Sequence, residues 1–346
     1  MERKIQKGGK KMHSRVRGLI ATLVLVSMVV GLFVGVTFAQ KNPIEMVIAM
    51  HSARTEEIVW GISARIKDAV EKGTKGAIKV RLLGPEVGGE RDLLEGLSRG
   101  EYQIMQSGDM CIGYYAPKYA ATGVPFVFSD YTVVKKAYEG NLGKKINESF
   151  IKNGNMRLIG LSKRGARLLT AKKPVYVPQD IKGVKLRVPE IRTWVEAWKG
   201  VGALPTPVAW PEVFTALQTG VVEMQENPVA QIYEAKLYEV QKYIMLTDHL
   251  SAYFHWLMNE DFYQKLSSEN RKIVLDAVKA ATEWGSAQRD KKTAETLVLM
   301  QKEYGIQVIV PNKYLFFEAA KPAIERITET EWAPEMKGYL EEVLGE

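Results

Sequence analysis

Short apolar strands alternate with amphipathic helices along this chain of 346 residues, and this alternation limits the possible folds most strongly. Residues 44–50 have the alternating pattern of a strand, and in the helix that follows the apolar residues Ile58, Ile62, Ile66 and Val70 recur at helical spacing. Further strands are predicted at 77–83 and 102–106, with a helix at 88–97 between them. The repeated strand–helix–strand order predicts parallel sheets with right-handed crossovers.

A second series of strands and helices begins after residue 125. Strands are predicted at 157–161, 183–188, 204–208 and 221–225, and helices at 133–138, 192–199 and 211–218. Two such series in a chain of this length predict an α/β protein with two lobes. A nearly unbroken helical pattern at 266–304 is long enough to brace both lobes, and a strand at 305–310 follows it.

The formal net charge of +8 resides mostly at the N-terminus. Seven Lys and Arg residues against a single Glu give residues 1–39 a net charge of +6, which leaves +2 for the remainder. The main part of the chain therefore has no basic surface of the kind that binds nucleic acid.

Residues 1–39 have the pattern of a signal peptide. A basic stretch precedes an apolar run at 19–38, and Thr37-Phe38-Ala39 supplies small residues where signal peptidase cleaves. Because the apolar run is long, an uncleaved membrane anchor is the alternative. Both interpretations place the bulk of the protein in the periplasm or another extracytoplasmic space. Cys111 is the single cysteine, which excludes an internal disulfide and predicts a small buried residue.

Motifs of catalysis and cofactor binding are missing from the sequence. It contains no His-Glu-x-x-His, Gly-x-Ser-x-Gly or Cys-x-x-Cys pattern, and its four histidines lack the spacing of metal ligands. The glycine-containing segments at 140–145 and 200–202 depart from phosphate-loop and dinucleotide patterns. We therefore expect no cofactor, no metal and no enzymatic activity.

Arg187 lies near the end of the short apolar strand Lys185-Leu186-Arg187-Val188, which Pro189 terminates. An arginine in this position is poorly placed for a solvated surface and well placed to meet an anion in a cleft. The planar guanidinium group can bind a carboxylate with two parallel hydrogen bonds. This feature predicts capture of a small organic acid.

The sequence around Arg187 resembles the substrate-binding subunits of tripartite ATP-independent periplasmic (TRAP) transporters, in the dicarboxylate-binding branch. The resemblance spans nearly all of residues 44–330 and is carried by the runs 167–170, 174–189, Trp210-Pro211-Glu212-Val213 and Gln225-Glu226-Asn227-Pro228. It implies a two-lobed fold like that of type II periplasmic binding proteins, with a hinge and a long helix spanning both lobes. It also implies transfer of the ligand to an ion-gradient-driven membrane permease.

The resemblance implies roles for several residues of the second lobe. Arg187 corresponds to the arginine that forms a salt bridge with the ligand carboxylate. Arg167 corresponds to a second ligand arginine, with a structural ion pair as the alternative. Asn227 corresponds to an amide that contacts the ligand, with an Asx turn as the alternative. Trp210 corresponds to an aromatic cover over the ligand, with core packing as the alternative.

His51 and Ser107 follow strand ends in the first lobe, where loops facing a ligand are expected, although a structural role is the alternative for both. Glu190 stands where sialic-acid binders of the family carry asparagine. An acid at this position would repel a second carboxylate, which disfavours sialic acid as the ligand.

The predicted organisation is a signal peptide at 1–39, a first lobe at 40–164 plus about 251–292, and a second lobe at about 165–250 plus 293–346. The predicted function is an extracytoplasmic solute receptor of a TRAP transporter. A periplasmic sensor for a signalling receptor and a periplasmic enzyme acting on an organic acid are the alternatives. The sequence leaves open whether the acid is a C4-dicarboxylate, a sugar acid, a 2-oxo acid or an aromatic acid.

Overall fold

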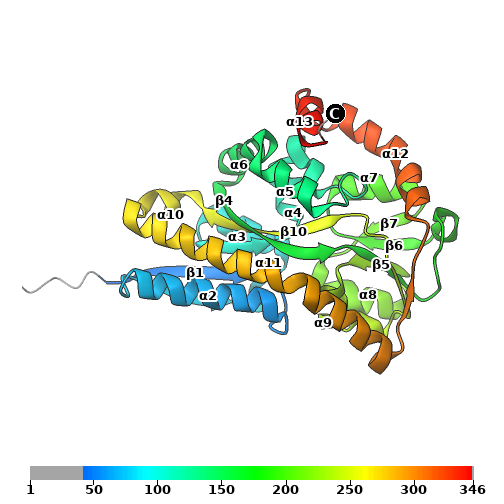
Figure 1. Cartoon of the computed structure of the whole chain (residues 1–346), viewed down its shortest axis with the longest axis horizontal. Coiled ribbons are helices and arrows are strands. Elements are labelled where there is room, and N and C mark those ends of the chain that lie inside the picture. The colour runs from blue at the N-terminus through cyan, green and yellow to red at the C-terminus, as the bar shows by residue number, and fades with distance from the viewer. Residues whose placement is uncertain (1–41, 345–346) are drawn as a thin grey trace, which may run out of the picture. The chain divides into compact units, whose positions relative to one another are not determined.

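The computed structural model describes residues 42–344, and the chain from Ile44 onward forms one compact unit (Figure 1). The predicted signal peptide at 1–39 lies outside the described residues. No helix within residues 42–344 has both the length and the apolar character needed to cross a bilayer. The fold is α/β with two sheets, as the sequence predicts.

The first sheet has five strands. In spatial order they are β2 (Ile78–Leu83), β1 (Ile44–Met50), β3 (Ile104–Ser107), β10 (Ser251–Asn259) and β4 (Met156–Ala166). β1 pairs in parallel with β2 and β3, but β10 runs antiparallel to both of its neighbours. The predicted parallel pairing therefore holds for β1 with β2 and β3 but not for β10 with its two neighbours. The sequence analysis missed β10 because every residue of this strand is buried, so its sequence lacks the alternation of a half-exposed strand.

The second sheet has six strands. In spatial order they are β11 (Gln307–Ile309), β9 (Tyr243–Met245), β5 (Leu168–Ala171), β8 (Met224–Asn227), β6 (Lys185–Val188) and β7 (Leu204–Pro207). The pairs β6–β7, β6–β8 and β9–β11 are parallel, whereas β5 runs antiparallel to β8 and β9. We call each sheet with its covering helices a lobe.

Helices cover both faces of the first sheet (Figure 1). One face packs against α2 (Glu57–Gly73), whose predicted apolar stripe is buried, and against the start of α11. The other face packs against α3 (Glu90–Arg99), α4 (Met110–Tyr115), α5 (Tyr131–Glu139) and α6 (Asn141–Gly154). Cys111, at the start of α4, is buried as predicted.

The long predicted helix is α11 (Ser268–Tyr304), which begins after the short helix α10 (Glu260–Lys265). Its N-cap is Ser267, whose side chain accepts a hydrogen bond from the backbone N–H of Asn270. α11 contacts α2 and β4 in the first lobe and then α9 in the second lobe. It braces both lobes, as the sequence predicts.

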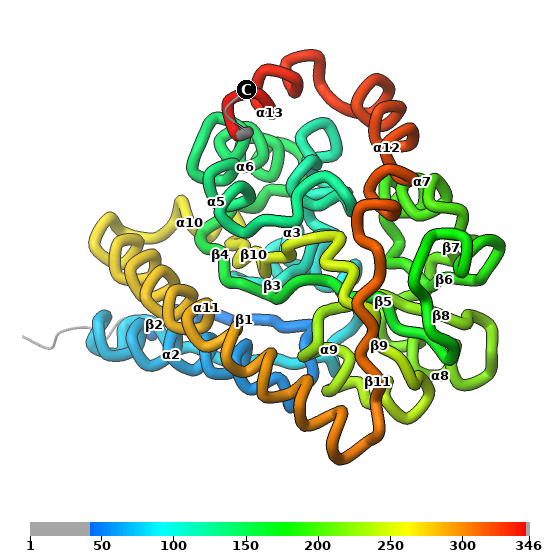
Figure 2. Tube along the Cα trace, turned by 45° about the vertical axis from the view of Figure 1, so that its right-hand side comes forward, coloured from blue at the N-terminus to red at the C-terminus, as the bar shows by residue number. Residues whose placement is uncertain are grey.

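The remaining helices belong mostly to the second lobe. They are α7 (Arg192–Val201), α8 (Val213–Thr219), α9 (Val229–Glu234) and α12 (Lys313–Thr330). Short 3-10 helices lie at Pro85–Val87, Pro117–Gly123, Pro178–Ile181, Trp210–Glu212 and Leu237–Glu239. The C-terminal helix α13 (Met336–Leu344) lies beside α5 and α6 of the first lobe (Figure 2). The sequence boundaries of the two lobes stay a prediction.

Gly285 permits the close packing of α11 on α2. A Cβ atom at this position would lie 2.3 Å from Cδ1 and 2.7 Å from Cγ1 of Ile62. We expect Gly285→Ala to lower the free energy of unfolding, measured by urea denaturation, by about 1–3 kcal/mol because overpacked cores must distort.

Gly338→Ala is the matched control, since this exposed glycine of α13 has no neighbour within 4 Å of the added atom. Alanine there should leave stability unchanged or raise it by up to about 1 kcal/mol through helix propensity. Equal effects of the two substitutions would contradict the packing argument.

Candidate ligand-binding site

Side chains from both lobes line a cavity. The first lobe contributes residues that follow β1 and β3, and the second lobe contributes residues of β6 and the end of β8. The lining residues are His51, Glu90, Asp109, Met110, Arg164, Arg167, Arg187, Pro189, Ile191, Trp194, Trp210 and Asn227. The cavity therefore lies where ligands commonly bind, at the carboxyl ends of sheet strands.

Arg187 lies in β6 and is only 3% exposed. Its Nε and Nη2 atoms both donate to the backbone oxygen of Val208, at 2.9 and 2.8 Å. No carboxylate of residues 42–344 lies within 4.0 Å of its guanidinium group to form an ion pair. Burial lowers the pKa of Arg187 to about 9, because the charged form is poorly solvated. The cavity wall thus contains a buried cation without an ion-pair partner among residues 42–344.

Arg167, which precedes β5, has the ion pair that Arg187 lacks. Its Nε and Nη2 atoms bind the two carboxylate oxygens of Glu226 at 2.5 and 2.8 Å, and both side chains are at most 2% exposed. Burial alone would raise the pKa of Glu226, but Arg167 and a hydrogen bond from His249 lower this pKa to about 2. The main interaction of Arg167 is therefore the structural ion pair that was the alternative to a ligand contact. A ligand contact stays a prediction, although Arg167 also lines the cavity.

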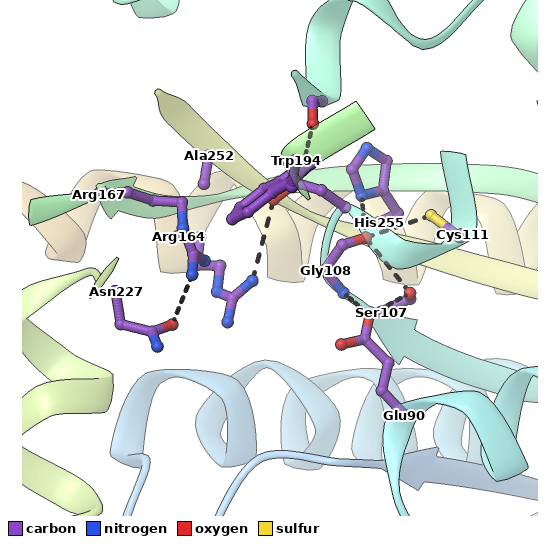
Figure 3. Close-up of polar contacts among 12 residues, drawn as sticks. Glu90, Ser107, Gly108, Cys111, Arg164, Arg167, Trp194, Asn227, Ala252 and His255 are labelled. Carbon is purple, nitrogen blue, oxygen red and sulfur yellow. Dashed lines mark hydrogen bonds and ion pairs between the residues drawn. The ribbon is translucent and has the colours of Figure 1, made fainter. Parts of the chain in front are cut away.

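Asn227 extends this network at the end of β8 (Figure 3). Its Oδ1 atom accepts a hydrogen bond from Nη2 of Arg167 at 2.9 Å, and its Nδ2 atom donates to Oε1 of Gln225 at 2.8 Å. These bonds to other side chains fix the amide at the cavity wall. The Asx-turn alternative requires a hydrogen bond from Asn227 to nearby backbone, and its side-chain bonds within residues 42–344 go to Arg167 and Gln225 instead.

Trp210 occupies the short helix before α8 and forms another part of the cavity wall. The centre of its ring lies 5.7 Å from the guanidinium carbon of Arg187. The side chain is only partly buried, and it also packs against the apolar cluster that contains Val213 and Leu217. Trp210 therefore lines the cavity and also packs against the second lobe, and its role as a cover over the ligand stays a prediction.

The two predicted residues of the first lobe have different positions. His51 lines the cavity, whereas Ser107 is fully buried behind Glu90 and does not. The hydroxyl of Ser107 donates to Oε1 of Glu90 at 2.7 Å, and the backbone N–H of Gly108 donates to the same oxygen at 2.6 Å (Figure 3). The geometry indicates that Ser107 orients Glu90.

Sequence reasoning missed Glu90, Asp109 and Arg164 as cavity residues. Arg164 comes from β4, and its Nη1 atom lies 4.0 Å from Oδ2 of Asp109. Burial raises the pKa of Asp109 to about 7. None of these residues belongs to a local motif that marks a site. Glu190, the acid noted from sequence, does not line the cavity but lines an adjoining wider hollow that shares Glu90 and Arg187 with it, and the acids that line the cavity itself are Glu90 and Asp109.

Within the described part of the chain, His, Cys, Asp and Glu side chains form no group of three or more placed to hold a metal ion. The arrangement combines a buried arginine without an ion-pair partner among residues 42–344, a fixed amide and an aromatic wall, which suits non-covalent capture of a small anion.

The fold and this cavity define a two-lobed solute-binding protein of the periplasmic type. Residues 49–331 match the family of bacterial extracellular solute-binding proteins, family 7, and the chain belongs to this family, the solute receptors of TRAP transporters. This confirms the family resemblance found in the sequence. Members of the family are solute receptors.

Several relatives support this assignment. A solute-binding protein of Roseobacter denitrificans is 30% identical over 91% of this chain and 94% of its own length. Its crystal structure with bound L-galactonate has a TM-score of 0.79 at 28% identity and covers 87% of this chain and 98% of that one. The sialic acid-binding periplasmic protein of Vibrio cholerae is 30% identical over 78% of this chain and 84% of its own. A Polaromonas structure bound to D-erythronate has a TM-score of 0.78 at 26% identity, covering 86% and 98%.

We expect three buried histidines to make the folded protein sensitive to acid. Burial lowers the pKa values of His51 and His249, and it lowers that of His255 to about 4. The unfolded chain takes up these protons near pH 6.5, before the folded state does, so the stability that the neutral histidines contribute is complete above that pH and falls below it. We expect the lowered pKa of His255 alone to reduce the free energy of unfolding by up to about 3 kcal/mol as the pH drops from 6.5 to about 4.

Urea denaturation at a series of pH values measures this loss. His255→Gln should be less stable at neutral pH, because Nδ1 of His255 donates to the oxygen of Gly108 at 2.9 Å. Its stability should nevertheless fall less steeply with acid than that of the wild type. Identical slopes in both proteins would contradict the assignment of this proton uptake to His255.

Proposed function

We propose that the protein is the extracytoplasmic receptor of a TRAP transporter and binds a small organic acid through a salt bridge from Arg187 to the ligand carboxylate. The observation that carries this proposal is the burial of Arg187 without an ion-pair partner among residues 42–344. A buried charge is costly unless it is paired, and a ligand carboxylate would supply the missing charge.

The hydrogen bonds of Arg187 leave a suitable edge free for this ligand. Nε and Nη2 share the oxygen of Val208, so the edge formed by Nη1 and the second hydrogen of Nη2 remains for two parallel bonds to a carboxylate. Because Arg187 is only 3% exposed, such bonds are stronger than at a protein surface.

The ligands of similar proteins agree with this proposal. The related structures from Roseobacter denitrificans and Polaromonas contain L-galactonate and D-erythronate, both anions of organic acids. For this chain we infer the same general class, a small organic acid held by its carboxylate.

The proposed binding step includes closure of the lobes. The cavity takes His51 from the first lobe and Arg187 and Asn227 from the second, so a ligand touching all three favours the closed arrangement. The closed receptor then delivers its ligand to membrane permease subunits driven by an ion gradient. Export by the signal peptide at 1–39 would place the receptor outside the cytoplasm.

Substitution of Arg187 tests the salt bridge. Saturating ligand at about 100 times its Kd should stabilise the wild type by about 2.7 kcal/mol, seen as a rise in Tm by differential scanning fluorimetry with a panel of organic acids. Arg187→Ala should abolish this rise in Tm. Arg187→Lys should retain part of it, because lysine keeps the positive charge but cannot form two parallel hydrogen bonds with the carboxylate. Arg192→Ala, at an exposed arginine of α7, should respond like the wild type. A full ligand-induced rise in Arg187→Ala would contradict the proposal.

The free-energy cost of burying the unpaired charge of Arg187 leads to a second prediction, about the stability of the ligand-free protein. Arg187→Met keeps an unbranched stem of similar size and removes the unpaired charge. Without ligand, we expect the free energy of unfolding of this variant to lie between that of the wild type and a value about 2 kcal/mol higher. The variant should no longer bind the ligand. A variant that is both unstable and unable to bind would indicate a structural role for this arginine instead.

A further inference from the structure

The first-lobe side of the cavity presents hydrogen-bond acceptors. Oε1 of Glu90 is occupied by the hydroxyl of Ser107 and the N–H of Gly108, at 2.7 and 2.6 Å. Oε2 of Glu90 accepts no hydrogen bond from residues 42–344, and the atom facing it is Nε2 of His51, at 3.7 Å. Glu90 is largely buried, so this oxygen faces the cavity without a donor.

The hydrogen bond on the other side of the His51 ring determines what Nε2 can do. Nδ1 of His51 lies 3.1 Å from the backbone oxygen of Gln106, and a carbonyl oxygen can only accept, so Nδ1 carries the proton. In the neutral ring Nε2 is then a bare acceptor. Burial lowers the pKa of His51 and favours this neutral form, although the nearby Glu90 opposes the shift. Two acceptors therefore stand side by side with no donor between them.

The charges around the cavity match a ligand with a single negative charge. Arg164, Arg167 and Arg187 are three cations, and Glu90 and Glu226 are two anions close to them. Oδ2 of Asp109 accepts no hydrogen bond among residues 42–344 and lies 4.0 Å from Nη1 of Arg164, and burial raises the pKa of Asp109 to about 7. This group therefore has a net charge of +1 when Asp109 is protonated and 0 when it is ionised, so it offers no positive charge for a second ligand carboxylate.

We infer that the ligand is a polyhydroxy monocarboxylate, whose carboxylate binds Arg187 and whose hydroxyl groups donate to Oε2 of Glu90 and Nε2 of His51. This inference rests on the proposed function and adds the chemistry of the ligand's other end. A second carboxylate at that end would face Glu90 and be repelled. An alkyl tail would leave both acceptors buried without donors. An ammonium group would lie close to Arg164, whose charge already acts on Glu90.

A series of six-carbon acids separates these possibilities by isothermal titration calorimetry near neutral pH. Galactonate has one carboxylate and a hydroxylated tail, galactarate adds a second carboxylate, hexanoate removes the hydroxyls, and 6-aminohexanoate ends in an ammonium group. We expect galactonate to bind most tightly and each of the others to bind at least about 10-fold more weakly. Erythronate repeats the comparison at four carbons, with succinate as its dicarboxylate counterpart.

Glu90→Gln tests the acceptor directly. The glutamine oxygen can still accept from Ser107 and Gly108, but an NH₂ group replaces the free Oε2 atom. We expect the affinity for galactonate to fall about 10- to 100-fold, while the affinity for galactarate rises because the repelling charge is gone. Glu101→Gln is the matched control, since Glu101 is an exposed acid just beyond the other end of α3, and its preferences should equal those of the wild type.

The outcomes distinguish this inference from the proposed function. If galactarate, succinate, hexanoate or 6-aminohexanoate binds as tightly as its polyhydroxy counterpart and loses its affinity in Arg187→Ala, the inference is wrong and the proposed function stands. If no acid in the series binds in a manner that depends on Arg187, both are wrong. Unchanged preferences in a folded Glu90→Gln protein would also overturn the inference.

Discussion

The buried guanidinium group of Arg187 is the constraint on which the proposed mechanism depends. Two arginines of the second lobe lie beside the same cavity, yet Glu226 neutralises Arg167 and no carboxylate of residues 42–344 pairs with Arg187. The first arginine can therefore anchor the wall while the second remains available. Because an unpaired buried charge destabilises a fold, its retention points to an anion that arrives from outside the chain.

The rest of the structure holds this cation and a set of acceptors on opposite sides of one cavity. The second sheet presents Arg187 and Asn227 at strand ends, and the first lobe presents His51 and Glu90. α11 runs along both lobes, so the two sets of groups belong to one compact unit. On the binding mode that we propose, a donor-lined wall and an acceptor-lined wall together select a ligand with a carboxylate at one end and hydroxyl groups at the other.

Local patterns in the sequence predicted the α/β class, the long helix and the strand that carries Arg187, because these depend on spacing along the chain. They missed β10, whose residues are buried on both faces and so lack alternation. Of the six predicted site residues, Ser107 alone does not line the cavity. Its contact with Glu90 joins residues distant in sequence, and one chain without its fold does not show such a contact. The same holds for the pairing of Arg167 with Glu226.

The most direct test of the central claim compares galactonate with its uncharged amide, galactonamide, by titration calorimetry on the wild-type protein. The two molecules share every hydroxyl group and differ only at the group that Arg187 is proposed to bind. Loss of the charged, two-bond contact should weaken the amide by about 100-fold or more. Equal affinities for galactonate and galactonamide would contradict capture of a carboxylate by Arg187.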